Sequence, residues 1–237
     1  MTRVLVIGDV HEPATHPGYL AFCSDLAEFW ETDRVVFIGD LLDMHAASFH
    51  PVEPESPGAS DEADQAEARI RVWYDRFPRA AVCIGNHDAR VHRLAASVRV
   101  PARFIRDYAK VWSTPGWKWK NEHTVDGTTF MHGTGLGGQS PALTAAKHSG
   151  LAAVACGHVH SVAGVSLMTS GQNHRTVWGL DTGCGVDVEH PAMNYGRNLF
   201  RKPVLAAGII VDRQPFSIAM KSERGGKYHR SRFKGDA

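Results

Sequence analysis

Short polar motifs rich in Asp, Asn and His follow apolar runs at five places in the chain. They are GDVH at 8–11, GD at 39–40, GNHD at 85–88, HG at 132–133 and GHVH at 157–160. Glycine lets the backbone turn sharply, so the side chain that follows it can project from the end of the run. Carboxylates and imidazoles bind manganese, iron or zinc well, and one aspartate can hold two ions together. These motifs therefore predict a site for a pair of divalent metals.

The elements that must position the first three motifs are predicted from their apolar patterns. Continuous apolar runs at 4–7, 35–38 and 80–84 indicate buried parallel strands. Between them, helical spacing over 18–32 and acidic residues near 61 indicate two helices. This alternation predicts a parallel sheet with right-handed crossovers, whose carboxyl ends meet at one crevice. The motifs should therefore converge there.

The second half of the chain is predicted to be rich in strands. Residues 89–112 look helical with a break at Pro101, and one further helix is expected at about 141–148. Strands separated by turn residues are expected at 128–131, 152–155, 162–168, 176–180, 204–211 and 216–220. We expect a single domain over 1–220 with a loop insertion at 44–60, followed by a basic and poorly ordered tail at 221–237.

Composition limits the class of protein. The 237 residues carry a net charge of +1, with 43% apolar and 22% charged residues, as in an ordinary soluble globular domain. This charge favours no particular partner. Four scattered cysteines predict reduced thiols. The sequence has no signal-peptide pattern and no apolar stretch of about 18 residues, so we expect a cytoplasmic protein without a membrane partner.

The five motifs, in this order, resemble the calcineurin-like metallophosphoesterase superfamily. Any one of them occurs by chance in many proteins, whereas the ordered set at strand ends is specific. The resemblance implies an α/β fold, a four-layer α/β/β/α sandwich of two mixed sheets. It also implies an enzyme that hydrolyses phosphate esters with two divalent metal ions, manganese first and iron, zinc, nickel or cobalt as alternatives.

Roles for individual residues follow from the resemblance. It implies two sets of three metal ligands, Asp9, His11 and His160 for one ion and Asn86, His132 and His158 for the other. Asp40 would bridge both ions, which would generate a bridging hydroxide as the nucleophile. His87 would donate a proton to the leaving group, and Asp43 would orient His87.

Two further residues are candidate substrate contacts. Arg90 follows the third motif and could bind a phosphate as a bidentate donor. The alternative is a solvated arginine on a helix. His45 lies near the second motif and could line the pocket, but we favour a histidine on a surface loop.

A basic, aromatic segment at 103–120 has two interpretations. Trp112, Trp117 and Trp119 alternate with lysines, a combination that single-stranded nucleic acid binding uses. The alternative, which we favour, is a solvated basic helix followed by a β-hairpin whose tryptophans belong to the core.

The substrate class is narrowed by departures from the family's phosphoprotein phosphatases. In those enzymes the aspartate that corresponds to Asp43 is followed by Arg-Gly, whereas Asp43 is followed by Met44 in this chain. In the third motif those enzymes usually carry Glu after the histidine, whereas this chain has Asp88. A phosphodiester needs one less cationic contact than a monoester, so we expect a phosphodiesterase acting on nucleic acid or a cyclic nucleotide. The alternatives are a phosphomonoesterase or phosphoprotein phosphatase and, less favoured, a non-catalytic metal-binding scaffold.

Overall fold

The computed structural model describes residues 1–48, 57–169, 175–190, 193, 201–221 and 228. Its first sheet has six strands in the order β11-β10-β1-β2-β3-β4. Strands β1 to β4 are parallel to one another, while β10 pairs antiparallel with both β1 and β11. The bounds are Arg3–Ile7 for β1, Arg34–Phe37 for β2, Ala80–Cys83 for β3, Trp117–Lys120 for β4, Ala206–Val211 for β10 and Gln214–Ala219 for β11.

The second sheet has five strands in the order β5-β6-β7-β9-β8. Its three inner strands are parallel, while β5 and β8 run antiparallel at its two edges. The bounds are Glu122–Val125 for β5, Thr128–Met131 for β6, Ala153–Cys156 for β7, Ala163–Thr169 for β8 and Thr176–Thr182 for β9.

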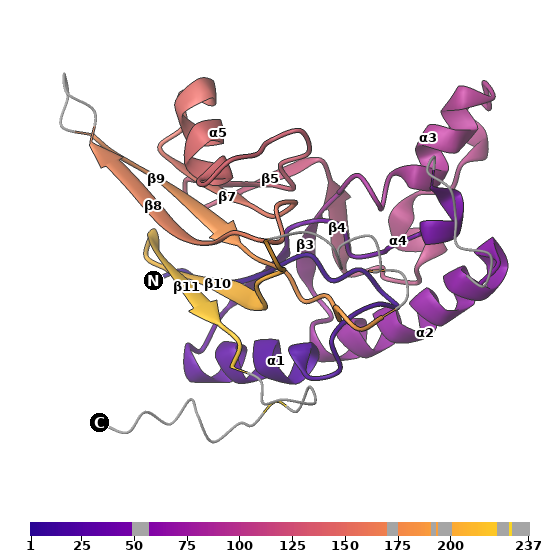
Figure 1. The fold of residues 1–237 in the computed structure, drawn as a ribbon, viewed down its shortest axis with the longest axis horizontal. Coiled ribbons are helices and arrows are strands. Elements are labelled where there is room, and N and C mark those ends of the chain that lie inside the picture. Colours follow the sequence, from indigo (N-terminus) through magenta and orange to yellow (C-terminus); the bar gives the residue numbers. More distant parts are fainter. Residues whose placement is uncertain (49–56, 170–174, 191–192, 194–200, 222–227, 229–237) are drawn as a thin grey trace.

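Helices cover the outer faces of the two sheets (Figure 1). Helices α1 (Tyr19–Phe29) and α2 (Ala59–Arg76) pack on the first sheet, with Phe22 and Trp73 in the outer core. Helix α5 (Pro141–Ser149) packs on the second sheet. The expected four-layer α/β/β/α sandwich is therefore confirmed.

Strand β1 shows why the first apolar run is continuous. Leu5 and Ile7 join the core beneath α1 and α2, whereas Val4 and Val6 join the core between the two sheets. Successive side chains of a strand point to opposite faces, and both faces of this strand are covered. All four positions are consequently buried and apolar.

The chain between β3 and β4 forms an arm that projects away from the sheets (Figure 1). It contains α3 (Arg90–Ser97), the 3-10 turn η2 (Ala102–Phe104) and the short helix α4 (Tyr108–Val111). The expected break at Pro101 falls between α3 and η2. Residues 89–112 are therefore three short helical pieces.

The prediction of a β-hairpin after the basic helix, within the segment 103–120, is wrong. Strand β4 pairs with β3 in the first sheet, whereas β5 pairs with β6 in the second. The tryptophans do belong to the core, as favoured. Trp117 is 3% exposed, packs on Phe37 at 4.9 Å between ring centroids and donates its Nε1–H to the carbonyl of Phe77. Burial of this side chain against α2 explains why β4 joins the first sheet.

Part of the expected loop insertion and tail lies outside the described residues. Of the segment 44–60, residues 49–56 are not described, the 3-10 turn η1 covers His45–Ala47, and α2 begins at Ala59 rather than near 61. Of the tail, only Lys221 and Tyr228 are described. The four cysteines are free and buried. Among the described residues, no helix combines the length and the apolar character that crossing a bilayer requires.

Candidate metal centre

Loops at the carboxyl ends of strands in both sheets converge on one site. Strands β1, β2 and β3 lead into the motifs at 8–11, 39–40 and 85–88, and β6 and β7 lead into those at 132–133 and 157–160. Parallel strands place their carboxyl ends at the same edge of a sheet. The two sheets face each other, so their loops contribute side chains to the same cluster.

The first group of potential ligands contains Asp9, His11 and His160. One ligand atom from each lies within 4.8 Å of the others. His160 Nε2 is 3.1 Å from Asp9 Oδ2, and the same nitrogen is 3.1 Å from His11 Nε2. A carboxylate with two imidazoles is a donor set that divalent transition metals bind.

The second group contains Asp40, His132 and His158, again with ligand atoms within 4.8 Å. His132 Nε2 lies 3.1 Å from Asp40 Oδ2 and 3.0 Å from Asn86 Oδ1. Asp40 Oδ2 also lies 3.7 Å from His11 Nε2, which belongs to the first group. All seven expected ligands are thus brought together, and Asp40 stands between the two groups.

The local backbone is shaped so that these side chains can approach one another. His11, Asp40 and His158 have φ of 56°, 46° and 68°, in the left-handed region that non-glycine residues rarely adopt. A Cβ at Gly85 would overlap Oδ1 and the backbone nitrogen of Asp40, and one at Gly157 would overlap Oδ1 of Asp9. Glycine at these two positions is therefore required by the carboxylates that press against them.

Two buried polar atoms of the expected ligands have no hydrogen-bond partner among the described residues. They are Asp9 Oδ1 and His132 Nδ1, and they lie 3.9 Å apart. A buried polar atom without a partner is costly, by about 1–3 kcal/mol and more for a charged group. Cations would provide the missing partners for this donor set, so the residues present fit a pair of divalent metals.

The candidate acid His87 adjoins both groups, and one of its ring nitrogens lies within 4.8 Å of ligand atoms of His11 and Asp40. Its Nδ1 is 2.9 Å from Asp43 Oδ1, and this same carboxylate oxygen is 2.9 Å from His11 Nδ1. Arg90 donates from Nη1 to the carbonyl of Asp43 at 2.6 Å, and its Nη2 lies 3.3 Å from His87 Nε2. Asp43 thus contacts both a potential ligand and the candidate acid, and the contact with His11 is the one that the sequence did not reveal.

The pKa values of the two histidines that contact Asp43, His11 and His87, are shifted in opposite directions. Burial and the neighbouring His87 lower the pKa of His11. Burial also opposes the protonation of His87, but the hydrogen bond to Asp43 and the charges of Asp40 and Asp43 outweigh it and raise the pKa of His87. These surroundings therefore favour the neutral form of His11, which a metal ligand needs, and the protonated form of His87, which an acid needs.

Burial also affects the pKa of the Asp40 and Asp43 carboxyls. It favours their neutral forms, but His132 beside Asp40, and hydrogen bonds from His11 and His87 to Asp43, lower the pKa of each below its ordinary value. Both groups are therefore carboxylates. In this form Asp40 can ligate a cation and Asp43 can accept from both histidines.

Two supporting residues lie next to the motifs. Asp88 accepts from the backbone of Leu42 at 3.0 Å and of Gly85 at 2.8 Å, so it ties the loop after β2 to the loop after β3. Glu12 is 1% exposed and accepts from Trp73 Nε1 at 2.7 Å, which joins the first loop to α2. The sequence signal for these two supporting residues was their position: Asp88 is the last residue of the GNHD motif, and Glu12 directly follows the GDVH motif.

His45 is only partly buried, and its ring is not joined to the metal groups by a described hydrogen bond. Its backbone nitrogen donates to Glu62 at 2.5 Å, while its Nε2 is buried without a partner among the described residues. Its contact with substrate stays a prediction, as does that of Arg90.

The fold and this cluster define a metallophosphoesterase, a class in which metal ligands gather at strand ends between two sheets. A sequence comparison agrees. Residues 2–162 match the family model described as calcineurin-like phosphoesterase, and the chain belongs to this family. No curated protein matches the chain.

Several solved structures resemble this one at low sequence identity. Vps29 from Chaetomium thermophilum is 12% identical with a TM-score of 0.50, over 97% of this chain and 94% of that one. A metallophosphoesterase from Sphaerobacter thermophilus is 14% identical with a TM-score of 0.48, over 94% and 90%. The nuclease MPE of Pseudomonas putida is 14% identical with a TM-score of 0.38, over 91% and 87%. Likeness at this level concerns the fold alone.

Proposed function

We propose that this chain hydrolyses phosphodiesters with two divalent cations. The observation that carries the proposal is a pair of adjoining ligand groups with Asp40 between them, next to a histidine whose pKa is raised. Asp9, His11 and His160 would hold one cation, and Asn86, His132 and His158 the other. When bound, the cations would activate water near neutral pH and offset charge on the phosphoryl oxygens.

The chain's own residues would handle the leaving group. His87 would donate its proton through Nε2 to the departing oxygen, because its Nδ1 is held by Asp43. Arg90 lies beside that nitrogen, so its guanidinium could contact a non-bridging phosphate oxygen and keep the ester within reach of His87. Asp43 would act on the reaction only by orienting His87.

The number of cationic side chains supports a diester over a monoester. Met44 follows Asp43 and is 5% exposed, so that position offers no charge to a phosphate. Arg90 would then be the arginine closest in the chain to the candidate acid. A monoester dianion requires one more cationic contact than a diester monoanion, so the diester suits this site better.

A substrate panel with manganese tests the proposal. We expect faster turnover of bis-p-nitrophenyl phosphate than of p-nitrophenyl phosphate, followed by cyclic nucleotides and single-stranded and duplex nucleic acids to find the natural class. Metal analysis of the purified protein should find two ions per chain. Faster turnover of the monoester would contradict the diester assignment, and absence of turnover from a protein that carries both ions would contradict the enzymatic function.

A further inference from the structure

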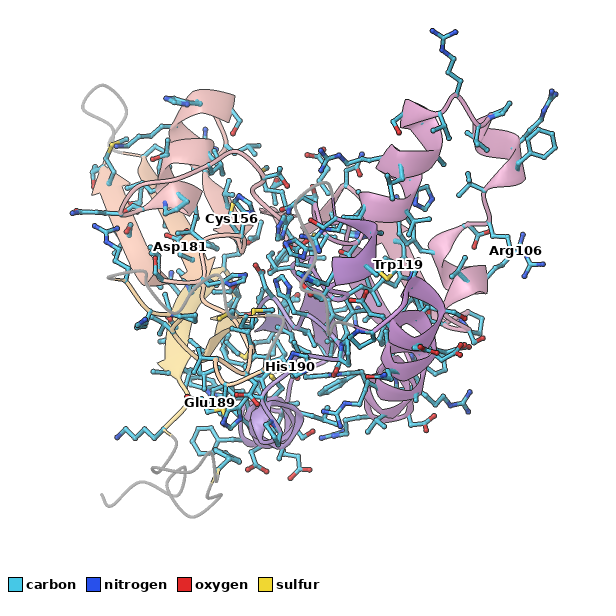
Figure 2. All side chains as sticks on the ribbon, turned by 45° about the vertical axis from the view of Figure 1, so that its right-hand side comes forward. Arg106, Trp119, Cys156, Asp181, Glu189 and His190 are labelled. Atoms are coloured by element: carbon cyan, nitrogen blue, oxygen red, sulfur yellow. The ribbon has the colours of Figure 1, made fainter. Side chains whose placement is uncertain are left out.

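The segment from Arg90 to Arg106, here called the arginine arm, has an unusual charge. It contains five arginines and no acidic residue. Arg99, Arg103 and Arg106 are exposed, and Figure 2 shows Arg106 pointing away from the body of the molecule. Side chains of one sign gathered on a projecting element attract a ligand of the opposite charge.

The arginine arm and the helix that follows it also expose apolar side chains. Half of the large hydrophobic side chains exposed in the described part of the chain lie between 91 and 111, namely Val91, Leu94, Val98, Val100, Phe104 and Val111. Phe104 is 69% exposed, and the guanidinium of Arg103 lies 5.4 Å from its ring centroid. A ring and guanidinium groups presented together can contact both a base and its phosphates.

The arginine arm begins at the candidate metal centre. Arg90 is its first residue, and this residue contacts Asp43 and His87. Helix α3 has eight residues and so spans about 12 Å, at about 1.5 Å per residue. For a strand stacked as in a duplex, with about 3.4 Å of axis per nucleotide, this distance corresponds to roughly three to four nucleotides, and to fewer for an extended strand. A chain of nucleotides with one phosphate at the centre could therefore continue along the arm.

The aromatic residues of 103–120 that first suggested nucleic acid binding do not provide this surface. Trp112 and Trp117 are buried, and Trp119 (labelled in Figure 2) is partly buried, with one face stacked on Tyr108 at 5.0 Å between ring centroids. Bases cannot stack on rings that are covered. The exposed cations and apolar groups lie instead along the arginine arm, on α3 and η2 and in the turns that follow each of them.

We propose that the arginine arm binds the part of a single-stranded nucleic acid that flanks the phosphate to be cut. This inference rests on the proposed phosphodiesterase function and names its substrate class. A second copy of the chain is a poor occupant, because two arms of like charge repel. An acidic peptide would satisfy the arginines, but only a polymer of phosphodiesters satisfies both the arm and the adjoining centre.

Binding of a labelled strand in the absence of metal tests the arginine arm separately from catalysis. The probe is a fluorescein-labelled oligothymidylate of about 12 nucleotides, within the span that such surfaces occupy. Fluorescence anisotropy with a chelator present gives the affinity at several salt concentrations. The double variant Arg99→Ala with Arg103→Ala should reduce the slope of log affinity against log salt by about 1.4, since each phosphate contact contributes about 0.7.

The control removes the same charge elsewhere. Arg34 pairs with Asp33 at the amino end of β2, and Arg71 pairs with Asp75 on α2, both with exposed side chains. The double variant Arg34→Ala with Arg71→Ala should keep the wild-type slope. Phe104→Ala leaves the charge unchanged and should weaken binding roughly 5- to 150-fold if a base stacks on this ring. All variants change exposed side chains, and thermal unfolding checks that they fold.

Each outcome decides the proposal. A reduced slope for the arm variant but not for the control, with weaker binding by Phe104→Ala, supports it. Equal slopes in the two double variants, or no binding by the wild type, would overturn it. Stronger binding of duplex than of single strand, or equal competition by polyglutamate, would overturn the assignment of a single strand. The proposed function is tested on a small diester that cannot extend along the arm beyond Arg90, so either idea can fail alone.

Discussion

A single carboxylate oxygen of Asp43 lies 2.9 Å from Nδ1 of His11 and of His87. A carboxylate on one ring nitrogen of a histidine determines which nitrogen faces the metal and holds the ring in place. The same contact keeps a catalytic histidine in its productive orientation. We therefore expect Asp43 to position both an expected metal ligand and the candidate acid, because the loop after β2 lies between the loops after β1 and β3.

Replacing His87 tests proton donation to the leaving group separately from metal binding. None of its atoms is among the expected ligands, so we expect His87→Asn to retain both metals. A nitrophenolate leaves without a proton, whereas a ribose alkoxide does not. Turnover of a nitrophenyl diester should fall modestly, while that of a dinucleotide should fall on the order of 10²–10⁴-fold. Equal losses on both substrates, in a folded variant with its metals bound, would remove His87 from the acid role.

At the scale of elements, Asp181 connects the second sheet with its helix. It lies at 3% exposure on β9, and its Oδ1 accepts from the backbone nitrogen of Ala142 at the start of α5. Burial raises the pKa of Asp181 to about 6, although this hydrogen bond opposes the shift. The folded protein therefore holds this proton more tightly than the unfolded chain.

The pKa of Asp181 predicts how stability depends on pH. The extra stability is complete below the unfolded pKa of about 3.9 and is lost as pH rises through about 6. Asp181→Asn keeps the acceptor for Ala142 but cannot ionise. As pH rises between these values, the variant should gain about 3 kcal/mol of stability relative to the wild type, because the pKa differs by about 2 units between the folded and unfolded states and each unit is worth about 1.4 kcal/mol. Urea unfolding across this range measures the difference. Asp126→Asn, in an exposed turn, is the control, and an equal change there would contradict the assignment.

At the scale of the whole molecule, the metal centre joins the two sheets. Asp9 and Asp40 come from loops of the first sheet, while His132 and His158 come from loops of the second. Cations bound between these loops would exist only in the folded protein. They should therefore stabilise the whole fold by mass action.

Thermal unfolding with and without manganese tests this coupling. At about 100 times the dissociation constant, manganese should add about 2.7 kcal/mol, which for a chain of this size raises Tm by roughly 5–10 °C. Asp40→Asn should lose this shift and both tightly bound ions, because Asp40 stands between the two ligand groups. Asp75→Asn, exposed on α2, should behave as wild type. An Asp40→Asn protein that keeps two ions and full turnover would contradict the bridging role.

The sequence was enough to predict the convergence of the first three motifs from their places at strand ends, and its resemblance to a known family was enough to predict the layers and the seven candidate ligands. Buried strands require continuous apolar runs, and parallel strands bring their carboxyl ends together, so local pattern and motif position carried this information. Tertiary structure alone decided what depends on distant partners. The strands WKWK and EHTV are one residue apart, yet they belong to different sheets, because β3 pairs with one and β6 with the other. The two contacts of Asp43 and the covered faces of the tryptophans arise in the same way, since residues far apart in the chain must first be packed together.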